Sequence, residues 1–171
     1  KFSVQGTLFI ELLGMTAMLP VFFRDYGIKG IWMAAFHSVS AFCNAGFDIL
    51  GFEKPDNSLI GYANDPLVCI PVALLIIVGG LGFIVIHNIY YAKLFPSLKK
   101  KKRLPLNLHS RVAICMTVAL LVIGTVGFLA FEWNNTLEGK NFFQKLLVSF
   151  FQSTSARTAG FASVDIASEH D

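Results

Sequence analysis

The chain has 171 residues, of which 54% are hydrophobic and 15% are charged, and its mean hydropathy is +0.61. Soluble domains carry roughly 25% charged residues, so this composition excludes an ordinary soluble protein and predicts an integral membrane protein. The three cysteines are odd in number and lack CxxC spacing, which argues against a disulfide framework or a metal site. We interpret Cys43, Cys69 and Cys115 as buried thiols.

The first half of the chain predicts two membrane-crossing segments with a shorter helix between them. Residues 4–23 and 67–86 are each about 20 mostly apolar residues long, enough to cross the hydrocarbon core of a bilayer as a helix. A charged turn at 24–29 precedes residues 30–42, which have helical composition but are too short to span, so we predict a re-entrant helix. Charged residues and turn formers at 52–65 predict an aqueous loop.

The second span contains the sequence GGLG at 79–82. No strand precedes it and its spacing does not match a nucleotide-binding loop, so we interpret it as a site of close helix contact. Residues 87–110 then leave the membrane. The formal net charge is +3, but seven of the 14 Lys and Arg residues fall between residues 93 and 111, five of them in the run KKKKR at 99–103. Basic runs beside spans mark the cytoplasmic side, which explains this run better than nucleic-acid binding does.

The rest of the chain repeats the first half in part. Residues 112–131 predict another uncharged span, 140–155 a second short helix, and 162–171 a polar exit. With the basic connector inside, both short helices enter the membrane from outside. The returning span of the second unit is missing, so we expect a fragment. The predicted fold is an all-α integral membrane protein of span, pore helix and span repeats, potassium-channel-like but incomplete: residues 1–95 form one unit, 96–107 the cytoplasmic basic connector, and 108–171 the start of the next unit.

Each short helix ends in a version of the same motif. FHSVSAFCNAGF at 36–47 and FQSTSARTAGF at 151–161 share an aromatic residue, small hydroxyl residues and a final Ala-Gly-Phe. Hydroxyl groups and non-helical backbone have no hydrogen-bond partner in hydrocarbon, so we expect both motifs to line a polar surface inside the protein. A short helix entering from outside also points its partly negative C-terminus to the bilayer centre, which favours a cation there.

These motifs, with GGLGF in the intervening span, closely resemble the membrane subunit of the Trk/Ktr/HKT potassium transporters, most of all the Ktr type. The resemblance covers essentially the whole chain, which would match the second repeat of that family and the first part of the third. It implies potassium uptake across the plasma membrane by a multi-pass protein, through a selectivity filter whose backbone carbonyls replace the hydration shell of the ion. The implied filter residues are Asn44, Ala45, Gly46, Phe47, Thr158, Ala159, Gly160 and Phe161.

The resemblance also implies partners. These are membrane lipid, a second copy of the full-length subunit in a homodimer, and a cytosolic ring of nucleotide-binding regulatory subunits. Potassium is the transported ion, with sodium as a second candidate. No enzymatic activity is expected, because the serines of both motifs lack a Gly-x-Ser-x-Gly context and a paired base.

Charged and polar residues near the motifs are candidates for supporting roles. Glu11 lies inside the first span, where an acid costs roughly 2.5 to 3.5 kcal/mol on insertion scales, so we expect either a hydrogen bond to a neighbouring helix or a place on the ion path. Arg157 directly precedes the second turn, and we expect a carboxylate partner because a bare positive charge repels cations. Asp48 and Asp165 are either acids that concentrate cations at an outer mouth or ordinary loop acids. His37 has no second ligand at metal spacing and is expected to pack.

A different class of function stays open. A membrane scaffold or receptor domain with re-entrant segments would bind a partner and conduct nothing. Two further copies of a half-helix that ends in glycine, elsewhere in the same polypeptide, would favour the pore. An intramembrane hydrolase is a third alternative, and no motif supports it.

Overall fold

The computed structural model describes residues 2–50, 59–63, 65–89, 106–133, 136–137 and 139–161. Over these residues all regular structure is helical, which confirms the all-α prediction. The elements are α1 (Phe2–Tyr26), α2 (Lys29–Phe42), the 3-10 helix η2 (Leu59–Tyr62), α3 (Pro66–Leu81), α4 (Phe83–Ile89), α5 (Leu108–Phe131) and α6 (Phe142–Thr158). Both α1 and α5 are long and apolar enough to cross a membrane. The basic run at 99–103 lies outside the described residues.

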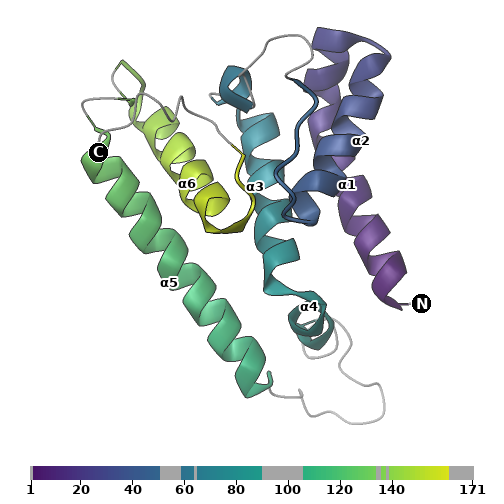
Figure 1. Ribbon diagram of the computed structural model, residues 1–171, viewed down its shortest axis with the longest axis vertical. Coiled ribbons are helices and arrows are strands. Elements are labelled where there is room, and N and C mark those ends of the chain that lie inside the picture. The colour runs from purple at the N-terminus through teal and green to yellow at the C-terminus, as the bar shows by residue number, and fades with distance from the viewer. Residues whose placement is uncertain are drawn as a thin grey trace.

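The central element is α3, which lies between two helix pairs (Figure 1). On one side the long α1 and the short α2 pack against each other and against α3. On the other side the long α5 packs against the short α6, and α6 contacts α3. The core joins all three parts, since Phe22 of α1, Ile76 of α3 and Phe151 of α6 are fully buried in one apolar cluster.

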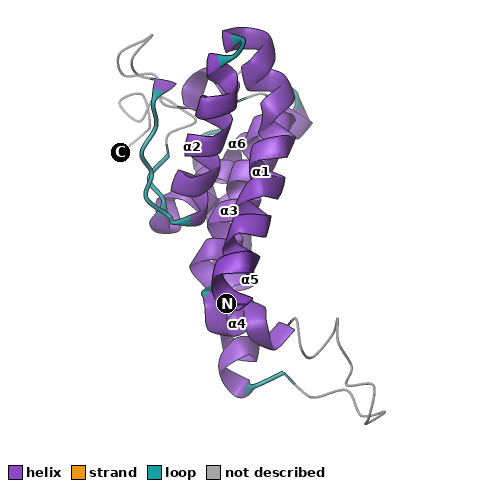
Figure 2. Cartoon of the chain, turned by 90° about the vertical axis from the view of Figure 1, so that its right-hand side faces the viewer, coloured by secondary structure: helices purple, strands orange, loops and turns teal. Residues whose placement is uncertain are grey.

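The two short helices do not cross the molecule. With 14 and 17 residues, α2 and α6 are about 21 and 26 Å long, less than the roughly 30 Å of a hydrocarbon core. Both start at the end of the molecule where α1 and α5 finish, run in the same direction, and stop beside α3 (Figures 1 and 2). This arrangement agrees with the prediction that both short helices enter from one side.

The predicted continuous span at 67–86 is wrong in one respect, because the helix is broken. α3 ends at Leu81, and α4 begins at Phe83 after a bend of 96°. Gly82 between them has φ +78°, a conformation that glycine adopts without the steric cost of a side chain. Its N–H donates to the carbonyl oxygen of Gly79 at 3.1 Å and closes α3.

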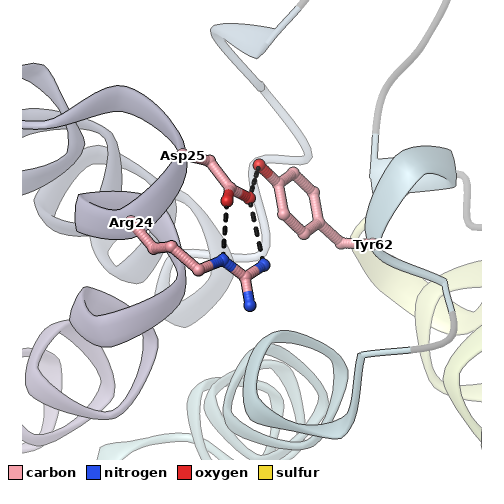
Figure 3. Close-up of polar contacts among 3 residues, drawn as sticks. All are labelled: Arg24, Asp25 and Tyr62. Atoms are coloured by element: carbon pink, nitrogen blue, oxygen red, sulfur yellow. Dashed lines mark hydrogen bonds and ion pairs between the residues drawn. The ribbon is translucent and has the colours of Figure 1, made fainter.

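A polar cluster fixes the end of α1 against the segment that leads into α3 (Figure 3). The Asp25 carboxylate accepts from Arg24 Nε at 2.8 Å and Nη2 at 3.4 Å, and from the Tyr62 hydroxyl at 3.0 Å. Burial raises the pKa of Tyr62, so its hydroxyl stays protonated and remains a donor. The charged turn predicted at residues 24–29 is shorter in the structure, because α1 continues to Tyr26.

The three cysteines are free thiols, but only one of them is buried. Cys69 on α3 donates from Sγ to the carbonyl oxygen of Tyr62 at 3.2 Å. Cys43 and Cys115 are exposed, which corrects the expectation of burial for these two. Cys43 follows the end of α2, and Cys115 lies on α5, a helix with little of its surface covered within this chain.

Candidate functional site

The two helix pairs repeat one docking contact. The Oγ of Ser38 on α2 donates to the backbone oxygen of Glu11 on α1 at 2.5 Å, and the Oγ of Ser153 on α6 donates to the backbone oxygen of Leu121 on α5 at 3.2 Å. A glycine three residues after each acceptor makes room for the serine; these are Gly14 and Gly124. Each motif contains the pattern S-x-S, at residues 38–40 and 153–155, and its first serine makes this contact. The sequence repeat is therefore also a structural repeat.

The second serine of each motif holds the turn that follows its helix. Ser40 Oγ donates to the carbonyl oxygen of Phe47 at 2.7 Å, and Ser155 Oγ donates to that of Phe161 at 2.5 Å. Sequence reasoning did not find these hydrogen bonds between the serines and the turns. The signal available was the placement of S-x-S before Ala-Gly-Phe in both motifs.

The two predicted filter turns meet at their glycines. Gly46 and Gly160 have φ angles of +71° and +77°. The backbones approach so closely that a Cβ on Gly46 would overlap the carbonyl oxygen of Ala159. A side-chain hydrogen bond of 2.8 Å between Asn44 and Thr158 also joins the turns. The structure thus brings together segments that are 114 residues apart in the sequence.

The predicted filter residues differ in their exposure. Ala45 and Gly160 are exposed, and Phe47 is 70% exposed, so the two turns present an open face in this chain. Ala159 and Phe161 are buried behind that face. The second turn is therefore anchored in the core through its phenylalanine, whereas the first is not.

The backbone of the second turn differs from the prediction of a helix that ends at residue 155. α6 continues through Thr158, and Ala159 has helical dihedral angles of φ −93° and ψ −35°. In the first motif, Asn44 has φ +54° two residues after the end of α2 at Phe42, but in the second motif the first positive φ comes only at Gly160. The carbonyl groups of Thr158 and Ala159 therefore belong to a helix C-terminus, where carbonyls lack intrahelical partners.

The glycines of α3 allow it to contact both motifs. A Cβ on Gly79 would overlap the carbonyl oxygen of Phe42, the last residue of α2. A Cβ on Gly80 would lie 3.4 Å from Arg157 Nη2 and 3.8 Å from the side-chain amide of Asn44. The interpretation of this segment as a site of close helix contact is therefore confirmed for Gly79 and Gly80.

Arg157, one of the residues predicted to support the filter, has no carboxylate partner within the described part of the chain. Arg157 is half-buried beside α3, and its Nη1 is buried without a hydrogen-bond partner. The ion pair that the structure shows among the described residues is Arg24–Asp25 at the end of α1, so no described carboxylate pairs with Arg157. Asp165, an acid that follows the second turn in sequence, lies outside the described residues, so a carboxylate partner for Arg157 stays a prediction.

The two candidate acids remain open in their roles. Within the part of the chain that the structure describes, the Glu11 side chain has no hydrogen bond or ion pair, although its backbone oxygen accepts from Ser38. The Asp48 carboxylate accepts from the backbone N–H of Leu50 at 3.1 Å, which orders the segment after the first turn. A place on the ion path stays a prediction for both.

His37 packs, as expected. It is fully buried, its Nδ1 lies 2.7 Å from the carbonyl oxygen of Met33, and its ring stacks on Phe22 with centroids 5.3 Å apart. The ring of Phe161 lies beyond it at 6.5 Å. His37 therefore belongs to the packing that anchors the second turn.

Comparisons with known proteins cover nearly the whole chain. The family model TrkH, described as cation transport protein, matches residues 6–171. The potassium/sodium uptake protein NtpJ of Enterococcus hirae is 42% identical over 167 residues, which cover 96% of this chain and 33% of the relative. The Ktr system potassium uptake protein B of Vibrio alginolyticus is 40% identical over 171 residues (97% and 35%), and that of Bacillus subtilis is 34% identical over 170 residues (98% and 34%). The chain thus spans about a third of the length of these curated relatives.

Proposed function

The chain belongs to the TrkH family of cation transport proteins, and from this premise we propose that it forms part of a potassium uptake pathway across the plasma membrane. The observation that carries the proposal is the contact between the two Ala-Gly-Phe turns. Each turn follows a helix too short to span, and Gly46 lies against the backbone of Ala159 and Gly160.

The chemistry proposed for the turns is ion desolvation. The C-terminal ends of α2 and α6 carry partial negative charge and lie at a similar level beside α3, where the two turns meet (Figure 1), which favours a cation there. Backbone carbonyls of the eight filter residues, Asn44 to Phe47 and Thr158 to Phe161, would replace water around potassium. Potassium filters are built from four such turns around one axis, so the proposal requires two more turns from the rest of the polypeptide.

The cargo and partners are proposed from the relatives. Their names specify potassium, and one name includes sodium, so sodium is the second candidate cargo. We propose a homodimer in the lipid bilayer that associates with a cytosolic nucleotide-binding regulatory ring. The basic run at 99–103 faces that side if it follows the rule for basic loops.

The test is growth of potassium-uptake-deficient cells in low potassium. The full polypeptide that carries this segment should restore growth and rubidium uptake, and Gly46→Ser should alter the preference for potassium over sodium. Restored growth that ignores substitutions at both Gly46 and Gly160 would overturn the proposed filter. Absence of any ion uptake by correctly inserted protein would favour the non-conducting scaffold.

A further inference from the structure

The Asn44 side chain joins its own turn to two other segments of the chain. It lies in the first turn, its amide is 2.8 Å from Thr158 Oγ1 in the second turn, and it lies against α3 at Gly80. The side chain is half-buried between these segments. Its position therefore differs from that of Ala45 and Phe47, which are exposed.

The orientation of the Asn44 amide follows from its neighbours, since amide oxygen and nitrogen are assigned by hydrogen bonding. With Nδ2 toward α3 and the second turn, it donates to the Ile76 carbonyl oxygen at 3.2 Å and to Thr158 Oγ1 at 2.8 Å. Its Oδ1 then accepts from the Gly80 N–H at 3.1 Å. Each of these three polar neighbours is thereby matched with a partner of the right kind.

The contact with α3 is specific. Ile76 and Gly80 are four residues apart, so their carbonyl and N–H groups are the pair that an undisturbed α-helix joins to each other. The Asn44 amide hydrogen bonds to both members of that pair. A side chain inserted into the helix ladder is a known cause of helix distortion, and α3 ends five residues after Ile76.

We propose that Asn44 is a specificity-determining residue, whose amide fixes the two filter turns relative to each other and to α3 and so sets the preference between potassium and sodium. The inference rests on the proposed function. Discrimination by a carbonyl filter depends on the number and arrangement of its oxygens. Without the amide, the turns would no longer be held in one arrangement, and sodium would be excluded less well.

Asn44 also has φ +54°, and asparagine tolerates this left-handed conformation better than most residues. The backbone role and the amide role are separable by substitution. Asn44→Gly keeps the left-handed conformation and removes the amide. Asn44→Asp keeps the shape and the acceptor for Gly80 but removes both Nδ2 donations. On the other turn, Thr158→Val removes the hydroxyl and Thr158→Ser retains it.

The experiment measures rubidium and sodium uptake by the full polypeptide in potassium-uptake-deficient cells, with the amount of protein in the membrane as a control for folding. Thr158→Val should lower the ratio of rubidium to sodium uptake by roughly threefold to tenfold, the effect of losing about one hydrogen bond. Asn44→Gly and Asn44→Asp remove more bonds of the amide and should lower the ratio at least as much. Thr158→Ser should retain a higher ratio than Thr158→Val. The double variant Asn44→Gly/Thr158→Val should lose no more than Asn44→Gly alone, because Asn44→Gly already removes the bond to Thr158.

A matched control removes a similar bond elsewhere. Asn88 Nδ2 on α4 donates to Ser110 Oγ on α5 at 2.8 Å, and Asn88→Ala should leave the ratio unchanged. A wild-type ratio in Asn44→Gly would overturn the inference, since the residue would then serve only its backbone angle. Additive losses in the double variant would overturn it too. If Asn44→Gly fails to accumulate in the membrane, the comparison of Thr158→Val with Thr158→Ser tests the inference, and equal uptake ratios for these two variants would overturn it. Failure of the unsubstituted protein to transport either ion would count against the proposed function instead.

Discussion

Position 46 favours glycine over every other residue for two independent reasons. Its φ of +71° is strained for other residues, and a Cβ would overlap the Ala159 carbonyl oxygen. Gly27, in the turn before α2, has a similar φ of +59° but no neighbouring atom within 4 Å of a Cβ. The two positions therefore separate backbone strain from contact between the turns.

We predict that Gly46→Ala lowers rubidium uptake and its ratio to sodium uptake, while Gly27→Ala retains both. Both variants incur the left-handed penalty of roughly 1–2 kcal/mol, but only the first forces the turns apart. Uptake in cells, normalised to the amount of protein in the membrane, is the measurement. Equal uptake by the two variants would show that the contact between the turns has no part in transport.

At the scale of the helices, the two docking contacts explain why the short helices take the same position in both pairs. Ser38 on α2 and Ser153 on α6 occupy equivalent places, each beside a glycine of the long helix in its pair. Gly14 on α1 and Gly124 on α5 therefore set how closely each pair packs. Small residues that allow close approach are the usual basis of helix association in membranes.

Gly124 and Gly127 provide a matched test of this packing within α5. Both lie in the helix interior, where alanine is favoured over glycine by about 1 kcal/mol. A Cβ on Gly124 would overlap Ser153 Oγ, whereas a Cβ on Gly127 meets no atom within 4 Å. We predict that Gly124→Ala lowers the thermal stability of the purified protein and that Gly127→Ala keeps or raises it. A higher melting temperature for Gly124→Ala would contradict the docking contact.

The helices show what the sequence can and cannot predict. The end of α2 was predictable because polar residues and a glycine follow an apolar run, and a length of about 14 residues excludes a crossing. The bend at Gly82 was not, since an apolar run that contains glycines has the same hydropathy straight or bent. The extension of α6 was missed because Ala156 and Arg157 are good helix formers, and only the later Gly160 ends the helix.

The side-chain bonds of the site were beyond sequence reasoning for another reason. The contacts of Asn44 depend on α3 and α6, which lie far away along the chain, and neither spacing nor composition reports which amide meets which backbone group. The repeated S-x-S was visible, yet its two different tasks, docking and holding the turn, appear only once the helices are in place.

At the scale of the whole molecule, α2 and α6 enter from one end, while the bend between α3 and α4 lies toward the other (Figure 1). Much of the apolar surface of α5 is exposed within this chain. That surface needs lipid or further protein around it, since contiguous exposed apolar patches of this kind mark membrane or protein contacts.

Cysteine labelling tests the orientation. In a variant without the three native cysteines, Ile28→Cys and Phe142→Cys, at the exposed starts of the two short helices, should react with a membrane-impermeant maleimide on intact cells. Lys101→Cys in the basic run should react only after permeabilisation, because basic loops stay in the cytoplasm. Labelling of Ile28→Cys and Phe142→Cys from opposite sides would contradict the repeat.

The central claim is that the two Ala-Gly-Phe turns supply carbonyl oxygens to one ion pathway, and anomalous diffraction from crystals of the full polypeptide soaked in thallium tests it most directly. We predict anomalous peaks on an axis bounded by the carbonyl oxygens of residues 44–47 and 158–161. Thallium bound only elsewhere, with the two turns empty and unconnected to any pathway, would contradict the account.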